Sequence, residues 1–314
     1  MSWDIFERNI LRHAFTKKKG NGVIMKKRRI FKLMVAVMLV CMFNVLLAGT
    51  SKNEVKASGR YNQTNKKIGK YGVFLGAEPE DVMKLKGYDT IVIDAQYFTK
   101  SQIKKLKKSG FTVYSYLNIG SVENFRSYYK KYEKYTMGEY EHWEEERWVD
   151  VSEKEWQNFI LKNLAPKILN KGVDGLFIDN VDVYYNFKRN DIFNGVTKIL
   201  KGLKKMGTYV SINGGDVYVT KYISKYGNPS PVMDAVNQET VFSAIDWEHN
   251  KFGKNKSSER KYFQKYIEKV ASYGLDVYLL EYTKDADLIK KIKKYCANKG
   301  FSYYASSTLE LKVP

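Results

Sequence analysis

A carboxylate stands at the end of an apolar segment near the middle of the chain. The stretch DGLFIDNVDVYYN, residues 174–186, runs from small and apolar residues into Asp179. A carboxylate in such a segment is costly to bury unless it has a partner or a role. A second segment of this kind, residues 234–243, carries Glu239 near its end. Two converging carboxylates are what cleavage of a glycosidic bond requires, one to exchange a proton with the bridging oxygen and one to act as nucleophile or to activate water.

Other reactive groups are not arranged for catalysis in this sequence. The histidines are His13, His142 and His249, and no two of them have the spacing of zinc ligands. No glycine-rich loop precedes Lys and Ser or Thr, no strand leads into GxGxxG, and no Ser or Cys stands in a nucleophile elbow. We therefore expect no metal site, no nucleotide and no other cofactor.

A repeated pattern of helix and strand signals surrounds the two carboxylates. Six Lys-rich amphipathic segments end in glycine, the residue that closes a last helical turn in the left-handed conformation, and a strand-like run follows each glycine within three residues. These glycines are Gly87, Gly110, Gly172, Gly207, Gly274 and Gly300. With two further runs at 71–77 and 234–243, the pattern predicts eight strands. Strands that alternate with helices pair in parallel, so we predict a (β/α)8 TIM barrel, with a doubly wound open sheet as the main alternative.

Polar side chains stand at the carboxyl ends of nearly all the predicted strands. In a (β/α)8 barrel these ends meet at one rim, where catalysis takes place, and carboxylates, amides and hydroxyls there suit a carbohydrate ligand. We expect this rim to bind substrate through Asp94, Asn118, Asn180, Asp182, Asn213, Gln238, Glu281 and Tyr282.

Several of these residues also have a structural interpretation. Asp182 is equally suited to cap the helix that follows it, because Asp is a favoured N-cap residue. Asn213 and Gln238 are equally suited to be core amides bonded to the backbone. Asp94 is also a candidate ion-pair partner for an Arg or Lys.

A long loop separates the third and fourth predicted strands. Residues 121–150 contain eight aromatic side chains, eight acids and five bases, a net charge of −3. Loops of this length on the active face of a barrel are usually functional, since aromatic faces stack on sugar rings and acids attract a deacetylated amino sugar. We expect Trp143, Trp148 and Asp150 to bind substrate. The alternatives are a solvated charged helix with its tyrosines packed inward, and an ion pair at Asp150.

The first 57 residues have the composition of a leader. A basic start at Met25 and an apolar run to Ala48 precede a polar stretch that ends at Ala57, which is typical of a secretion signal. The apolar run is shorter than the ~20 residues that span a bilayer, which favours cleavage over an uncleaved membrane anchor. We therefore predict an upstream extension at 1–24 and a signal at 25–57. A linker at 58–70 should help to cover the last strand, and the barrel should occupy 71–314. The tail after Ser307 is too short for a full closing helix.

The chain without its leader is basic and holds one cysteine. It keeps 42 of the 54 Lys and Arg and 31 of the 34 Asp and Glu, a net charge of about +11. The lysines are spread over the predicted outer helices, which indicates a solvated surface and disfavours nucleic-acid binding. Cys41 lies in the signal, so Cys296 has no disulfide partner and is expected to be a small buried residue. We expect a secreted monomer that can reside at the cell surface and that meets a membrane only through its signal.

Five segments of the sequence resemble one known family. They are SYLNIGSVENFRSYY, RWVDVSEKEWQNFILKNL, KGVDGLFIDNVDVYYN, SINGG and AVNQETVF. Together they are similar, in register over residues 71–307, to the glycoside hydrolase family of endo-α-1,4-polygalactosaminidases. The resemblance implies a TIM barrel, no cofactor, and an extracellular polysaccharide containing α-1,4-linked galactosamine or N-acetylgalactosamine. It also implies that the family's strand-four Asp and strand-six Glu fall on Asp179 and Glu239.

The two carboxylates have different expected roles. Asp179 is short and ends a central strand, so it can be held close to an anomeric carbon as the nucleophile. Glu239 is longer and precedes the apolar segment TVFSAIDW, which should raise its pKa and keep it protonated as the acid/base. These roles predict a retaining mechanism. The alternative is a catalytically silent barrel that binds cell-surface or biofilm polysaccharide.

Overall fold

The computed structural model of the chain describes residues 69–249 and 251–314. These residues all belong to one unit, Gln63–Pro314. The predicted extension at 1–24, the predicted signal at 25–57 and the linker up to residue 68 lie outside the described residues. Among the described helices, none has both the length and the apolar character needed to cross a membrane.

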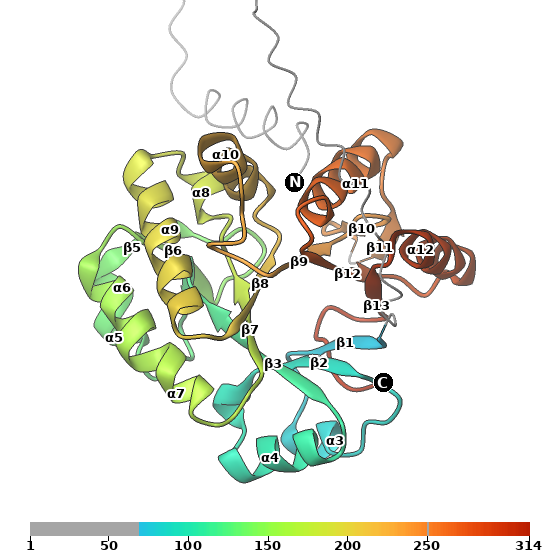
Figure 1. Cartoon of the computed structure of the whole chain (residues 1–314), viewed down its shortest axis with the longest axis horizontal. Helices are drawn as coiled ribbons and strands as arrows, with labels where there is room; N and C mark the ends of the chain where they lie inside the picture. Colours follow the sequence, from blue (N-terminus) through green and yellow to red (C-terminus); the bar gives the residue numbers. More distant parts are fainter. Residues whose placement is uncertain (1–68, 250) are drawn as a thin grey trace, which may run out of the picture. The chain divides into compact units, whose positions relative to one another are not determined.

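Eight parallel strands form one sheet in which each strand pairs with the next sheet strand along the chain (Figure 1). The first and last strands contact each other, and Ser302 Oγ donates to the carbonyl of Gly69 at 3.1 Å. A doubly wound sheet would reverse its strand order in the middle, so the predicted (β/α)8 barrel is confirmed. The strands are β1 (Tyr71–Phe74), β2 (Thr90–Ile93), β3 (Thr112–Asn118), β7 (Gly175–Asp179), β8 (Tyr209–Asn213), β9 (Ala235–Glu239), β12 (Asp276–Tyr282) and β13 (Ser302–Ser306).

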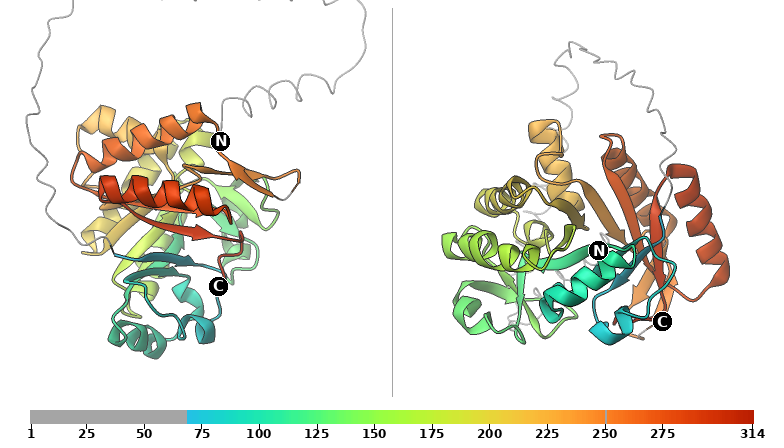
Figure 2. Two further views of the ribbon diagram at one scale, coloured as in Figure 1. Left: turned by 90° about the vertical axis from the view of Figure 1, so that its right-hand side faces the viewer. Right: turned by 60° about the horizontal axis from the view of Figure 1, so that its bottom comes forward.

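Helices cover the outside of the strands (Figures 1 and 2). They are α3 (Pro79–Val82), α4 (Lys100–Lys108), α5 (Tyr129–Tyr132), α6 (Lys154–Phe159), α7 (Ala165–Leu169), α8 (Val183–Asn186), α9 (Asn190–Lys205), α10 (Asp216–Tyr226), α11 (Ser257–Ala271) and α12 (Ala286–Lys299), with short 3-10 or π turns at Ala95–Tyr97, Glu133–Tyr135 and Ile160–Leu164. The six glycines predicted to end helical segments all have φ between 72° and 95°, the left-handed conformation that glycine adopts without strain. Helix α12 also buries Cys296, as expected.

The carboxyl ends of the strands carry two β structures that the sequence analysis did not predict. After β3, the long loop folds into an antiparallel sheet of β4 (Ser121–Glu123), β6 (Glu146–Val149) and β5 (Thr136–Glu139). After β9, β10 (Ser243–Asp246) and β11 (Lys251–Lys254) form a hairpin. In the left view of Figure 2 this hairpin projects on the side to which the arrowheads of β1 and β13 point. Both additions therefore stand at the end of the barrel where catalysis is expected.

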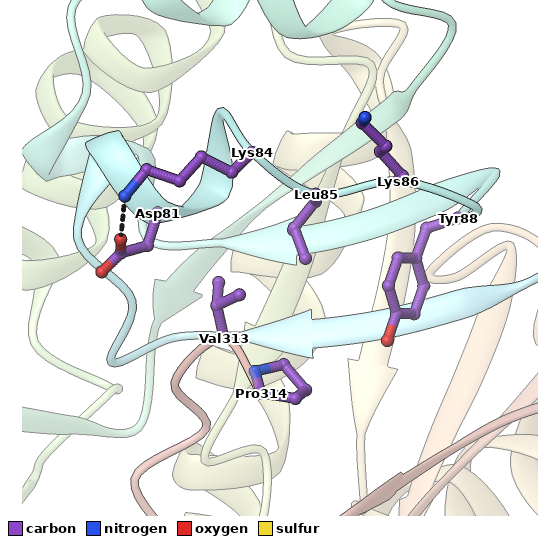
Figure 3. A pocket seen from close by; sticks show the side chains of 7 residues that line it. All are labelled: Asp81, Lys84, Leu85, Lys86, Tyr88, Val313 and Pro314. Carbon is purple, nitrogen blue, oxygen red and sulfur yellow. Dashed lines mark hydrogen bonds and ion pairs between the residues drawn. The ribbon is translucent and has the colours of Figure 1, made fainter.

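The described chain has no helix after β13, which agrees with the predicted short or missing last helix. The tail packs beside the end of β1. A Cβ at Gly76 would lie 2.1 Å from the carbonyl oxygen of Glu310. Further along, Val313 and Pro314 line a small pocket together with residues 81–88, after β1 (Figure 3). These contacts join the tail to β1 and the segment around α3, outside the barrel interior.

Candidate active site

Asp179 and Glu239 end β7 and β9, on either side of β8. Asn213 ends β8 and lies between them. Its Nδ2 donates to Asp179 Oδ1 at 3.0 Å and to Glu239 Oε1 at 2.7 Å. Because the strands are parallel, their carboxyl ends meet at one rim. The structure therefore brings the two expected catalytic carboxylates together around one amide.

Burial is the main influence on both carboxylates. It raises the pKa of Asp179 and of Glu239, and the hydrogen bond from Asn213 opposes that rise in each. A hydrogen bond from Tyr116 also lowers the pKa of Asp179, and Tyr282 OH donates to Glu239 Oε2 at 2.9 Å. The charge of Asp179 further raises the pKa of Glu239. The pair therefore holds a proton to a higher pH than solvated carboxylates do.

A second amide, Asn237, supports Asn213 from deeper in the barrel. Asn237 Nδ2 donates to Asn213 Oδ1 at 2.7 Å, and Tyr71 OH donates to Asn237 Oδ1 at 3.1 Å. This series of bonds orients the Asn213 amide so that its nitrogen faces the carboxylates. Asn237 was not predicted from the sequence, although it lies two residues before Glu239 and so faces the same side of the strand.

A third carboxylate, Glu146, joins the pair from the loop after β3, and the sequence analysis did not single it out. Glu146 begins β6, and its Oε2 accepts hydrogen bonds from Ser121 Oγ at 2.6 Å and from Asn180 Nδ2 at 3.1 Å. Burial, followed by the charge of Asp179, raises the pKa of Glu146 to about 8. Only the folding of β4 and β6 brings this residue to the rim.

Asn118 and Asn180, both expected to bind substrate, are buried in the same network. Asn118 Nδ2 donates to Ser121 Oγ at 2.6 Å, and Asn180 Oδ1 accepts from Tyr140 OH at 3.0 Å. Asn180 has a φ of 61°, and a Cβ at Gly120 would lie 1.8 Å from its carbonyl oxygen. Asn tolerates the left-handed conformation better than most residues, and Gly120 leaves the necessary space. The two amides therefore position the loop after β3 against the end of β7.

Asp182 extends the acidic rim toward the loop after β8. Its Oδ2 accepts a hydrogen bond from Gly215 N at 3.2 Å, and its side chain makes no capping bond to α8. Burial and the charge of Asp216 raise the pKa of Asp182 to about 7. Tyr262 OH in turn donates to Asp216 Oδ2. The helix-cap interpretation of Asp182 therefore does not hold, and the residue remains at the rim.

Asp94 and Asp150, both expected to bind substrate, form ion pairs, which was the alternative for each. Asp94 Oδ2 lies 2.7 Å from Arg126 Nη1, and Arg126 Nη2 lies 2.9 Å from Glu123 Oε1, with all three side chains buried. Asp150 Oδ2 lies 3.0 Å from Arg189 Nη2, and its other oxygen accepts hydrogen bonds from a neighbouring serine. These partners fix the orientation of both carboxylates, and their contact with substrate stays a prediction.

Gln238 and Glu281 face away from the barrel interior, because they alternate with Glu239 and Tyr282, which face it. Glu281 is fully buried and accepts hydrogen bonds from Ser243 N at 2.8 Å and Ser243 Oγ at 2.6 Å. The amide of Gln238 is also buried and donates to the carbonyl of Glu239 at 3.0 Å. Neither side chain faces the barrel interior in this structure, and their contact with substrate stays a prediction. Tyr282, through its bond to Glu239, is part of the site.

Two exposed tryptophans of this end, Trp143 and Trp247, come from different loops. Trp143 precedes β6 and is 41% exposed, and its ring lies 6.3 Å from that of Trp247 at the end of β10. His142 stacks on Trp247 with the ring planes 7° apart. Trp148 is instead buried and stacked on Tyr140, with ring centroids 4.3 Å apart. The burial of Trp148 differs from the exposed stacking face that was expected, and its contact with a sugar stays a prediction. Trp247 was not predicted from the sequence.

The arrangement as a whole is suited to acid/base chemistry. Two carboxylates share a donor, and burial favours a retained proton on the pair. Within residues 69–249 and 251–314, no group of three His, Cys, Asp or Glu side chains is placed to hold a metal ion. Such a pair of carboxylates can protonate a leaving oxygen and attack the carbon that bears it.

Comparison with known proteins finds one family and several related structures. The model of glycoside-hydrolase family GH114 matches residues 52–310. An uncharacterized protein of Methanocaldococcus jannaschii is 22% identical, over 93% of this chain and 95% of its own. The glycoside hydrolase domain of PelA from Pseudomonas aeruginosa covers 78% of this chain and 99% of its own with a TM-score of 0.62 at 15% identity. Ega3 of Aspergillus fumigatus, solved in complex with galactosamine, covers 81% and 98% with a TM-score of 0.60 at 18% identity. These two structures share the fold described above.

Proposed function

The chain belongs to glycoside-hydrolase family GH114 and is a glycoside hydrolase, and on this premise we propose that it cleaves internal α-1,4 linkages of a polysaccharide containing galactosamine or N-acetylgalactosamine. The observation that carries the proposal is the pair Asp179 and Glu239, held around the amide of Asn213. The sugar found with Ega3, a protein of the same fold, supports an amino-sugar substrate.

The charge of the rim also supports a cationic amino sugar. Residues 1–314 have a formal net charge of +20, yet Asp179, Glu239, Glu146 and Asp182 gather at this one place. The pKa of each is raised, chiefly by burial. An ammonium group bound among these acids would stabilise their ionised forms, so the cluster favours a positively charged ligand.

We propose a retaining mechanism with Asp179 as nucleophile and Glu239 as acid/base. Asp179 Oδ1 and Glu239 Oε1 lie within 3.0 Å of the same nitrogen, so these two oxygens are less than about 6 Å apart. Retaining enzymes separate the two carboxyl groups by about 5–5.5 Å, and inverting enzymes by ~6.5–9.5 Å to leave room for water. The short separation supports attack on the anomeric carbon by Asp179 while Glu239 protonates the leaving oxygen.

The expected site of action is outside the cell. The composition of residues 25–57, a basic start followed by an apolar run, supports export through a secretion signal. Acting outside the cell also fits a polymer that is too large to enter it.

The proposal is tested by incubating the protein with partly deacetylated α-1,4-galactosamine polymer and measuring new reducing ends and chain length. An endo-acting hydrolase should shorten the polymer early, and Asp179→Asn should bind it without releasing ends. A polymer of galactose without amino groups serves as the control substrate. Binding without cleavage by the wild-type protein would instead identify a catalytically silent barrel.

A further inference from the structure

Glu146 has one carboxylate oxygen held by the protein and the other without a protein partner. Its Oε2 lies 2.6 Å from Ser121 Oγ, 3.1 Å from Asn180 Nδ2 and 3.5 Å from Asn118 Nδ2. Within the described part of the chain, Oε1 receives no hydrogen bond and is not among the buried unsatisfied atoms. Glu146 therefore has a fixed orientation and one free acceptor at the rim.

The position of Glu146 relative to Asp179 decides what that acceptor can meet. Asn180 follows Asp179 directly in the chain and binds Glu146 through its side chain. The charge of Asp179 is also the largest electrostatic influence on Glu146 after burial. We therefore expect a substituent next to the sugar carbon that Asp179 attacks to lie close to Glu146.

The chemistry of amino sugars places the amino group at that point. In a 2-amino-2-deoxy sugar the nitrogen is bonded to the carbon beside the anomeric carbon. When Asp179 faces the anomeric carbon, the 2-substituent of the same sugar ring lies beside it. A free amine there is a hydrogen-bond donor with a positive charge, whereas an N-acetyl group is neutral and larger.

We propose that Glu146 Oε1 accepts a hydrogen bond from the free 2-amino group of the sugar at the cleavage point, which makes Glu146 the residue that selects a deacetylated unit there. This inference rests on the proposed function. Charge-assisted hydrogen bonds of this kind are the stronger ones in proteins. The three donors to Oε2 hold the carboxylate so that little conformational freedom is lost on binding.

The electrostatic surroundings of Glu146 fit a role in which its charge depends on the ligand. With a pKa of about 8, its carboxyl group holds a proton at neutral pH in the absence of substrate. A protonated amine that binds at Oε1 favours the ionised form, so the carboxyl proton passes to solvent as the ammonium group binds. Binding of a deacetylated sugar near pH 7 should then release a proton, and binding of an N-acetylated sugar should not.

The test compares Glu146→Gln with the wild-type protein on fully deacetylated and fully N-acetylated α-1,4-galactosamine polymers. Glu144→Gln is the matched control, because Glu144 is exposed in the same turn and the charge change is identical. We expect kcat/KM of Glu146→Gln to fall at least tenfold on the deacetylated polymer, mainly through KM, and to change less than threefold on the acetylated one. Glu144→Gln should change neither by more than threefold.

Proton release provides a second measurement that does not depend on turnover. The heat of binding galactosamine is measured in two buffers of different ionisation enthalpy, first for wild-type protein and then for Glu146→Gln. The wild-type heat should depend on the buffer, and the variant heat should not. A Gln side chain retains an acceptor for the Ser121 and Asn180 bonds, and an unchanged melting temperature or a higher one shows that the variant is folded.

Several results would overturn the inference. One is a fall in kcat/KM of Glu146→Gln that is equal on both polymers, and another is no fall on either. A third is a wild-type protein that cleaves only the acetylated polymer. A wild-type protein that cleaves neither polymer would contradict the proposed function itself, and so the two failures are distinguishable.

Discussion

Asn213 gives both hydrogens of one side-chain amide to Asp179 and Glu239, at 3.0 and 2.7 Å. Its oxygen is held by Asn237, so the amide has a single orientation. The amide lowers the pKa of both carboxylates against the effect of burial. One neutral side chain therefore sets both the spacing and the protonation of the pair.

Asn213→Ala should move the pH dependence of kcat/KM toward alkaline pH. Loss of the shared donor raises the pKa of Asp179, so the acidic limb, where the nucleophile becomes ionised, shifts to higher pH. The pKa of Glu239 rises too, which shifts the alkaline limb in the same direction. We expect kcat at the new optimum to fall by about 10²-fold, since positioning is also lost. A profile that keeps both limbs in place would contradict this role for Asn213, and Asn228→Ala, in an exposed loop, is the control.

The barrel and its central pair were predictable from local sequence features. Glycine followed by an apolar or aromatic run marks the start of six of the eight strands, and parallel strands must place their carboxyl ends at one rim. This brings Asp179, Asn213 and Glu239 together without further information. Gln238 and Glu281 lie away from the interior because adjacent strand residues point to opposite faces, so only one residue of each terminal pair reaches the interior.

The remainder of the site depends on loop folding that leaves little trace in the sequence. Glu146 reaches the rim because β4 pairs with β6, opposite Glu123 in the register. The connection between β5 and β6 contains no glycine and no Asn-Gly pair, either of which would signal a hairpin turn. His142 adopts the left-handed φ of 70° that glycine or Asn usually takes in such a turn. With the turn unrecognised, neither the pairing nor the place of Glu146 was predictable.

Trp143 and Trp148 should respond differently to replacement by alanine. Trp143 is exposed beside Trp247, so Trp143→Ala should weaken polymer binding by about 1 kcal/mol, roughly fivefold in Kd, without affecting stability. Trp148 is packed against Tyr140, so Trp148→Ala should lower the free energy of unfolding by about 3 kcal/mol. Thermal melting and polymer-binding titrations measure the two effects.

Trp247→Ala tests whether the loop after β3, which carries Trp143, and the β10–β11 hairpin form one binding surface. It should weaken polymer binding as much as Trp143→Ala does, and the double replacement should cost less than the two losses added together, because the rings contact each other. Tyr226→Ala is the control, since Tyr226 is an exposed aromatic residue at the end of α10. Full additivity, or an equal loss in the control, would show that the rings do not form a shared surface.

Glu281→Gln should destabilise the fold and leave the chemistry intact. The Glu281 carboxylate accepts hydrogen bonds from Phe242 N and from Ser243 N and Oγ. A Gln side chain puts an NH2 donor in place of one carboxylate oxygen; with its oxygen at the position bonded by Ser243, that NH2 faces the N–H of Phe242. A buried donor left unsatisfied costs about 1–3 kcal/mol. We expect the free energy of unfolding to fall by about 2 kcal/mol, with kcat/KM per folded molecule unchanged. Unchanged stability with weaker substrate binding would instead support the prediction that Glu281 binds substrate.

Glu146→Gln should stabilise the protein above neutral pH. Folding raises the pKa of Glu146 from an ordinary 4.5 to about 8, so the folded state holds the proton more tightly than the unfolded state does. This contribution to stability is complete below pH 4.5 and is lost as the pH rises through about 8. The neutral Gln has no such loss. The difference in melting temperature between variant and wild type should therefore grow from pH 5 to pH 8, and a constant difference would contradict the burial effect.

The roles of Asp179 and Glu239 can be separated by the configuration of an azide product. In Asp179→Ala the nucleophile is absent, so azide attacks an α-glycoside with a good leaving group directly and gives the β-azide by a single inversion. In Glu239→Ala the leaving group departs without an acid, Asp179 still forms the glycosyl-enzyme, and azide then displaces Asp179 to give the α-azide by two inversions. The assignment predicts both products, identified by NMR, with each variant at least 10³-fold slower than wild type on the natural polymer. The opposite configurations would exchange the two roles, and no azide product from either variant would point to an inverting mechanism.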